Sequence, residues 1–251
     1  MMRRFDLKRT LQGIATGGLL LAMTMGAAGA AKSALIQPTA QTRSVSGSAS
    51  AQDPGGPVSD SNSDQATDFT PFVSAVSATA TLNDAEGTGG GIQNSEIQDD
   101  AIVASGSTSA TAESFEEEGR ADGSGSSIVV VEFTLLTQAS YTLQGELSAF
   151  DNGSAELVLR NSAGDIFRDD ATGTIVIDDA GTLPAGPYTL EINASGNASA
   201  DFPFAAEFAF AEYDITLQFT VAAVPAVGPV GLAALALLLA AIGRAASVVR
   251  H

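Results

Sequence analysis

The chain has 251 residues, enough for one or two domains, and a formal net charge of −18. It contains no cysteine, which excludes disulfides, thiol nucleophiles and thiolate metal sites. Between residues 31 and 243, five basic side chains stand against twenty-eight acidic ones, a charge of −23 for that part. Such an acidic surface repels a phosphate backbone, so we expect no nucleic-acid partner.

The first thirty residues carry the ordered features of a secretory signal. Four basic residues between positions 3 and 9 precede an apolar stretch over 11–25. Ala28 and Ala30 then supply the small side chains that signal peptidase accepts at its cleavage site. We therefore predict a signal peptide over residues 1–30, signal peptidase as a partner, and an exported mature chain.

Residues 31–127 are rich in Ser, Ala, Gly and acidic residues and poor in large apolar ones. They are either a disordered acidic linker, which buries too little apolar area to fold, or thin strands with small inward residues. Val and Thr in "FVSAVSATATL" favour strand. We expect short weak strands near 43–52, 70–83 and 101–113 with mobile loops between them. We interpret "GTGGGIQ" at 87–93 as a flexible loop, because no apolar strand precedes it.

Residues 128–222 show a clearer alternation of apolar and polar side chains. In "EYDITLQFTV", apolar side chains occupy every odd position from 213 to 221. Similar segments are separated by turn residues, such as Asn161 to Asp165. Period-two segments of this kind indicate antiparallel sheets with one solvated face, and two such sheets must cover each other's apolar faces. The sequence therefore predicts an all-β fold, an antiparallel β-sandwich over 128–222.

The phenylalanines before the last of these strands raise a problem of register. They stand at the even positions 202, 204, 208 and 210, whereas the strand from Tyr213 buries odd positions. A strand cannot change the face that it buries without a slip. We therefore expect a bulge or a turn around residues 211–212.

Four motifs between Ser140 and Phe219 carry a family resemblance. They are "YTLQG" at 141–145, "LVLRNSAGD" at 157–165, "LPAGPYTLEI" at 183–192 and "YDITL" at 213–217. This run resembles the bacterial pre-peptidase C-terminal domains and related jelly-roll modules. The resemblance implies a jelly-roll-like sandwich and a non-catalytic role in adhesion, carbohydrate contact or scaffolding. Pro184 and Gly186 are expected to form the turn that starts a strand, with Tyr188 capping the core.

Residues that carry catalysis or hold metals are scarce. The single histidine is His251, at the end of the chain, so a Ser-His-Asp triad and a histidine metal site are excluded. We expect no enzyme activity, no cofactor and no metal. Asp165, Asp169 and Asp170 are the only candidates for calcium, with solvation of a loop as the alternative.

The C-terminal tail begins with "VPAVGP" and continues as an uncharged apolar run. A helix from Val224 to Gly243 would rise roughly 30 Å at about 1.5 Å per residue, close to the thickness of a bilayer core. We therefore predict a C-terminal transmembrane helix in segment 223–251. Because the amino end is exported, Arg244 and Arg250 should face the cytoplasm.

This tail resembles the PEP-CTERM class of bacterial C-terminal sorting signals, which combine a short Pro-containing motif, an apolar helix and a basic end. The matching residues are Val224, Pro225, Pro229, Gly231, Arg244 and Arg250. The resemblance implies recognition by an exosortase-like membrane enzyme, removal of the helix, and delivery to the cell surface or extracellular matrix. A permanent membrane anchor is the alternative.

Taken along the chain, these features predict a non-enzymatic structural protein of the cell surface or biofilm matrix, associated with exopolysaccharide. The alternative is a carbohydrate-binding or adhesion module acting on exopolysaccharide. Such a module needs exposed aromatic side chains on one face. The chain has no Trp, and its three Tyr all fall on positions expected to point inward, which argues against the alternative.

Overall fold

The structure, a computed structural model, describes residues 34–201 and 203–221. Within these residues the regular elements are twelve β-strands, and their pairings are antiparallel. They are β1 (Ile36–Asp53), β2 (Gly56–Gln65), β3 (Phe72–Thr81), β4 (Ala85–Ile97), β5 (Ala101–Ser114), β6 (Arg120–Leu135), β7 (Ala139–Asp151), β8 (Gly153–Asn161), β9 (Gly164–Ala171), β10 (Thr174–Leu183), β11 (Gly186–Ala200) and β12 (Ala206–Val221).

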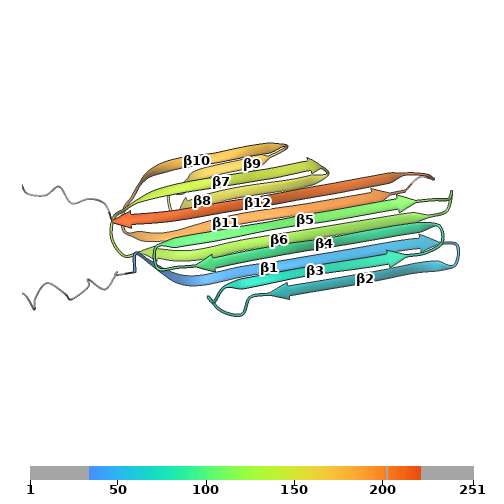
Figure 1. Cartoon of the computed structure of the whole chain (residues 1–251), viewed down its shortest axis with the longest axis horizontal. Helices are drawn as coiled ribbons and strands as arrows, with labels where there is room; N and C mark the ends of the chain where they lie inside the picture. Colours follow the sequence, from blue (N-terminus) through green and yellow to red (C-terminus); the bar gives the residue numbers. More distant parts are fainter. Residues whose placement is uncertain (1–33, 202, 222–251) are drawn as a thin grey trace, which may run out of the picture. The chain divides into compact units, whose positions relative to one another are not determined.

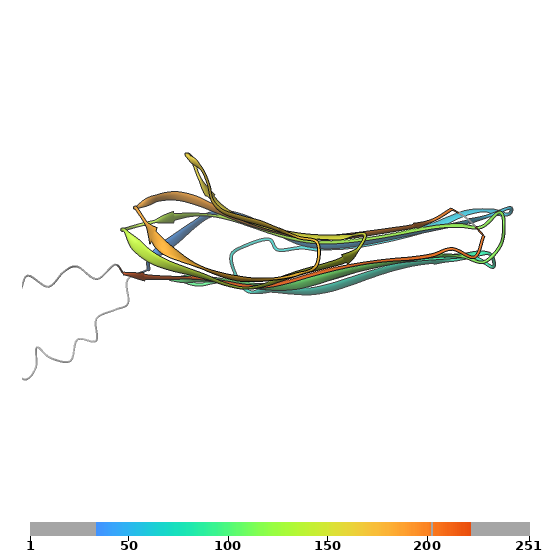
Figure 2. The same ribbon diagram turned by 90° about the horizontal axis from the view of Figure 1, so that it is seen from above.

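The strands form two six-stranded sheets that face each other as a β-sandwich (Figures 1 and 2). Sheet A has the order β2-β1-β6-β11-β8-β9, and sheet B has the order β10-β7-β12-β5-β4-β3. The expectation of an all-β antiparallel sandwich is therefore confirmed. The expected helices at the two ends of the chain lie outside the described residues.

The strands of residues 36–114 belong to the same two sheets as those that follow. Strands with small inward side chains are thus the correct interpretation, and the disordered linker is wrong for this part of the chain. β1, with 18 residues, is longer than the strand expected near 43–52, and β3 and β5 lie close to those expected near 70–83 and 101–113. β2 and β4 are not among the expected strands. Short turns stand where several mobile loops were expected. Two residues separate β1 from β2, and three residues separate β3 from β4 and β4 from β5.

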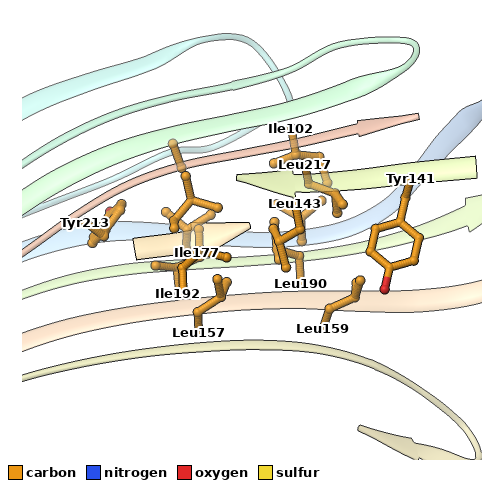
Figure 3. Packing of buried hydrophobic residues seen from close by; sticks show 14 of the residues in the cluster. Ile102, Tyr141, Leu143, Leu157, Leu159, Ile177, Leu190, Ile192, Tyr213 and Leu217 are labelled. Carbon is orange, nitrogen blue, oxygen red and sulfur yellow. The ribbon is translucent and has the colours of Figure 1, made fainter. Parts of the chain in front are cut away.

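One end of the sandwich has a core of large aliphatic and aromatic side chains. Figure 3 shows Leu143, Leu190 and Leu217 gathered between the sheets with their neighbours from other strands. Phe133 packs between two further rings, with its centroid 5.8 Å from that of Tyr188 and 5.5 Å from that of Phe219. Burial of this apolar surface is the main source of stability in a fold without disulfides.

The other end of the sandwich has a core whose buried members are all alanine, with Leu82 packed against it. Its buried members are Ala49, Ala51, Ala78, Ala80, Ala85, Ala110, Ala112, Ala121, Ala198, Ala200 and Ala209. Seen from above, the two sheets run close together toward this end (Figure 2). Side chains of a single carbon fill the space between the sheets because little space remains.

Glycines allow this close approach of the two sheets. A Cβ on Gly89 of β4 would lie 2.0 Å from the carbonyl oxygen of Ser124 in the facing sheet. A Cβ on Gly123 of β6 would lie 1.9 Å from the carbonyl oxygen of Thr88. Any side chain at these positions would collide with backbone of the other sheet. The expectation of a flexible loop at 87–93 is therefore wrong. This segment is part of strand β4, and its glycines allow the sheets to pack closely.

A belt of buried polar side chains separates the two cores. Along β6, Ser127 lies between Val129 of the apolar core and Ala121 of the alanine core.

The guanidinium of Arg43 is fully buried and donates to the carbonyl oxygens of Asp68 at 2.5 Å, Thr70 at 2.8 Å and Ser95 at 3.2 Å. Burial lowers the pKa of Arg43, and the nearby Asp68 carboxylate opposes that effect. Arg43 thus ties the segment between β2 and β3 to the core.

Neither the bulge nor the turn expected around residues 211–212 occurs. β12 keeps one register with β5 from Ala206 to Gln218, and it buries every odd position from Ala209 to Phe219. Ala209 and Ala211 point inward, whereas Phe208 is 52% exposed on the outer face of sheet B. Phe204 lies in the turn before β12, and Phe202 lies outside the described residues.

Two expected turns are confirmed. β8 and β9 are joined by a tight turn after Asn161, whose side-chain oxygen accepts a hydrogen bond from the backbone N–H of Ala163 at 2.8 Å. Gly186 has φ +151°, which favours glycine, and it starts β11. The Tyr188 hydroxyl donates to the Pro184 carbonyl oxygen at 2.8 Å and closes this turn. In the part of the chain described here, we find no helix with the length and apolarity needed to cross a membrane.

Candidate functional site

The outer face of sheet A carries rows of serine hydroxyls across neighbouring strands. The register places Ser63, Ser46, Ser126, Ser195 and Ser154 in one row, and Ser61, Ser48, Ser124 and Asn197 in the next. A third row holds Ser59, Ser50, Asp122 and Ser199. We call these three rows the serine surface. Its pattern follows from alternation, since outward Ser or another polar residue alternates with inward small residues, mostly Ala and Gly, along this part of β1, β6, β8 and β11.

Hydroxyl pairs within the serine surface are already hydrogen-bonded to each other. Ser46 and Ser126 are joined at 2.8 Å between their Oγ atoms, as are Ser48 and Ser124. A hydroxyl has one donor and two acceptor positions, so each paired serine keeps capacity for a further partner. The pairs fix the side-chain positions, and the remaining capacity faces solvent.

A hollow of about 840 Å³ lies over two of these rows. The serine surface lines it, together with Asp60 of β2, Asn152 of the turn between β7 and β8, and Glu207 of β12. Its hydrogen-bonding residues are Ser48, Ser50, Ser59, Asp60, Ser61, Asp122, Ser124, Asn152, Asn197, Ser199 and Glu207. The lining contains neither an aromatic nor a basic side chain.

Carboxylates hold the hollow in shape through short-range hydrogen bonds. Asp122 accepts from Ser50 Oγ at 3.0 Å and from Ser199 Oγ at 2.7 Å. Glu207 accepts from Asn152 Nδ2 at 3.1 Å and from the backbone N–H of Ser199 at 3.3 Å. The serines that line the hollow lack an adjacent imidazole or amine that would remove a proton. The geometry therefore suits hydrogen bonding to a polyhydroxylated ligand more than nucleophilic attack.

The grid of hydroxyls has the spacing of the sheet itself. Neighbouring strands lie about 4.8 Å apart and alternate residues along a strand about 6.8 Å apart. A sugar chain offers hydroxyls at comparable intervals, and serine, Asn and Asp supply both donors and acceptors for them. What the hollow lacks is an apolar platform for a sugar ring.

The sorting and signal residues predicted from the sequence lie outside the described residues. These are Ala28, Ala30, Val224, Pro225, Pro229, Gly231, Arg244 and Arg250. Nothing in the fold tests their predicted roles.

Two of the three acidic candidates for calcium lie beside an arginine instead. Asp165 and Asp170 of β9 lie 3.3 Å and 4.0 Å from guanidinium nitrogens of Arg168, which is also paired with Glu156. These acids raise the pKa of Arg168. Asp169 accepts a hydrogen bond from the backbone N–H of Asp170 at 3.0 Å. Across residues 34–201 and 203–221 no group of three acidic or histidine side chains is arranged to hold a metal.

The tyrosines lie in the core, and exposed phenylalanines lie on the outer face of sheet B. The three tyrosines point inward as expected, with exposed fractions of 6% for Tyr141, 3% for Tyr188 and 2% for Tyr213. Phe150 and Phe208 are about half exposed, on the outer face of sheet B. The exposed aromatic side chains on this face are thus phenylalanines, which the absence of Trp and the inward Tyr do not exclude.

The comparisons with known proteins establish no family. No family model matches the chain, and no curated protein matches it. Among solved structures, the carbohydrate-binding module TmCBM61 in complex with β-1,4-galactotriose aligns with 43% of this chain and 74% of its own, at 9% identity and a TM-score of 0.21. A structure of the infectious bursal disease virus Gt strain aligns with 72% of this chain and 57% of its own, at 11% identity and a TM-score of 0.22. TM-scores this low do not establish a shared fold.

Proposed function

We propose that the protein is an exported, non-enzymatic structural protein of the bacterial cell surface or extracellular matrix. The observation that carries this proposal is the serine surface, a hydroxyl-rich outer face that crosses five strands of sheet A. Rigid antiparallel strands hold such a face flat and hydrated, which suits contact with a polysaccharide gel. The chain's acidity keeps copies apart and soluble during export.

The route to that location is part of the same proposal. A signal peptide ending at Ala30 directs export, and the tail over residues 223–251 holds the precursor in the membrane until an exosortase-like enzyme acts. Fractionation of the producing cells followed by mass spectrometry tests this. We expect peptides from the sandwich in the surface or matrix fraction, and none beyond about residue 230. Recovery of Arg250 with the sandwich in the inner membrane would establish a permanent anchor instead.

A second candidate function, carbohydrate binding, is favoured by the hollow over the serine surface. Its volume of about 840 Å³ lies in the range of small-molecule sites, and it is lined by neutral and acidic hydrogen-bonding groups. We expect micromolar binding to one class of neutral glycan on a glycan array. Asn197→Ala combined with Ser124→Ala should weaken that binding.

The matched control for this test is Thr142→Ala, which removes an exposed hydroxyl from sheet B instead. A glycan that binds both variants with unchanged affinity would place its site elsewhere. No binding to any glycan would leave the matrix proposal without this second activity.

A further inference from the structure

Three phenylalanines lie side by side on the outer face of sheet B. Phe210 of β12 stands opposite Phe150 of β7, and their ring centroids are 6.4 Å apart with planes 26° from parallel. Phe208 is on the same face of β12, two residues earlier, and is 52% exposed. Single exposed apolar residues are ordinary, but a stacked group on one face marks an interaction surface. We call these three residues the phenylalanine platform.

A groove of about 390 Å³ leads away from this platform across β5, β4 and β3. Its axis follows a row of directly paired residues, from Phe210 to Ser109, Gly90 and Ser77. Gly90 has no side chain to fill the floor of the groove. A Cβ at this position would collide with backbone, 2.7 Å from the Val76 carbonyl oxygen. Hydroxyls from neighbouring rows line the groove, including that of Thr88. One groove therefore joins aromatic rings to hydroxyl groups.

The charge around the groove is entirely negative. The six strands of sheet B contain no lysine, arginine or histidine. Glu212 follows Phe210 by two positions on the same face, about 7 Å along the strand. Asp214 comes next on that face and stands directly opposite Glu146 of β7. A ligand that packs on the platform is therefore beside Glu212, and one that extends along β12 also meets Asp214 and Glu146.

The negative charge and the strand pairing around the groove indicate which class of ligand it can bind. An anionic polymer is repelled, and so is a second copy of this acidic chain. A basic peptide gains little, because β4, β5 and β12 are each paired on both sides and offer it no free backbone groups. The groove runs across the strands, so it suits a chain that binds through hydroxyls and ring faces.

We propose that the outer face of sheet B binds a cationic amino-sugar polysaccharide, a chain of pyranose rings with free amines. The apolar C–H face of a ring packs on the phenylalanine platform. Hydroxyls of the rings in the groove bond to Ser109, Ser77 and Thr88. The ammonium group of the ring on the platform pairs with Glu212, and those of rings that extend past the platform along β12 pair with Asp214 and Glu146. This inference goes beyond the proposed function, because it concerns the opposite face and does not depend on how the tail is processed.

Titration calorimetry on the full chain tests this, with a β-1,4-linked glucosamine hexamer and its fully N-acetylated counterpart as probes. We expect the glucosamine hexamer to bind at least about tenfold more tightly, and its affinity to fall as salt rises. Phe210→Ala and Phe208→Ala should each weaken it about tenfold, since each removes exposed aromatic area without entering the core. Glu212→Gln with Asp214→Asn should remove the preference for the free amine.

Matched controls come from sheet A. Val58→Ala removes an exposed apolar side chain and Glu132→Gln an exposed carboxylate, and both should bind the hexamer as the unaltered chain does. Equal affinity for the two hexamers, or affinity unchanged by the phenylalanine variants, would overturn the proposal. So would tight binding of oligolysine that the Phe210→Ala variant loses, because the ligand would then be a peptide. The localisation experiment can fail while this one succeeds, so the two outcomes are distinguishable.

Discussion

The phenolic oxygen of Tyr213 lies 2.8 Å from the hydroxyl oxygen of Ser127, and this hydrogen bond joins sheet B to sheet A at the border between the two cores. The Gln93 side chain donates to the same phenolic oxygen at 3.1 Å. The ring fits because its partner in β5 is Gly106, where a Cβ would lie 2.6 Å from the ring. A buried polar contact at this point marks where the sandwich changes from large to small core residues.

We expect Tyr213→Phe to lower the free energy of unfolding by about 1 to 2 kcal/mol, because it leaves a buried hydroxyl and a buried amide short of a partner. Urea denaturation measures the change. Ser127→Ala and the double variant complete a cycle, in which the double variant should cost less than the sum of the two single ones. Strictly additive costs would show that the two hydroxyls do not interact.

The glycines between the sheets give a sharper test of the close packing. Gly89→Ala and Gly123→Ala should each destabilise the fold by at least about 2 kcal/mol, because the added carbon meets backbone rather than a movable side chain. Gly173, in the turn between β9 and β10, has no atom near its Cβ position and is the matched control. Gly173→Ala should change the melting temperature little. If all three variants had the same melting temperature, the sheets would be further apart than the structure places them.

The sequence predicts the strands of residues 128–222 well because their inward and outward side chains differ in size and polarity. Leu143 and Leu147 face the core and Gln144 faces water, so the period of two is visible. In β1 the inward residues are Ala49 and Ala51, and the outward ones are serines. Alanine and serine differ too little in hydropathy for the alternation to be visible, so the sequence of a long strand of this kind resembles that of a disordered linker.

The outward phenylalanines escaped prediction for a related reason. Phe210 would be an inward residue if size and hydropathy alone decided. The backbone of sheet A is too close, since a Cβ on Gly153 would lie 2.0 Å from the Phe210 carbonyl oxygen. Only Ala209 and Ala211 fit between the sheets there, which forces the rings outward. The distance between two sheets is a property of the assembled fold, and a single strand does not reveal it.

Buried Arg43 predicts a local loss of order when it is replaced. Its three carbonyl acceptors include Asp68 and Thr70, in the segment between β2 and β3. Arg43→Met should lower the free energy of unfolding by about 2 kcal/mol and open residues 66–71 to proteolysis, because those carbonyls lose their donor. Limited proteolysis with mass spectrometry locates the cut. Arg120→Met, which changes an exposed arginine, should be cut no faster than the unaltered chain, and a cut elsewhere in Arg43→Met would contradict this role.

The free energy of unfolding should fall at alkaline pH, and the pKa of Tyr141 identifies the pH range of that fall. Burial, followed by the hydrogen bond to Asp179, raises the pKa of Tyr141 from 10 to about 12. Burial likewise raises the pKa values of Tyr188 and Tyr213. A folded-state pKa above the unfolded one means that the unfolded chain releases its proton first, so the stabilisation is complete below pH 10 and is lost as pH rises toward 12. Urea midpoints between pH 8 and pH 12 measure this decline, and Tyr141→Phe should make it shallower. An unchanged slope in that variant would show that the phenol of Tyr141 is not protected in the folded chain.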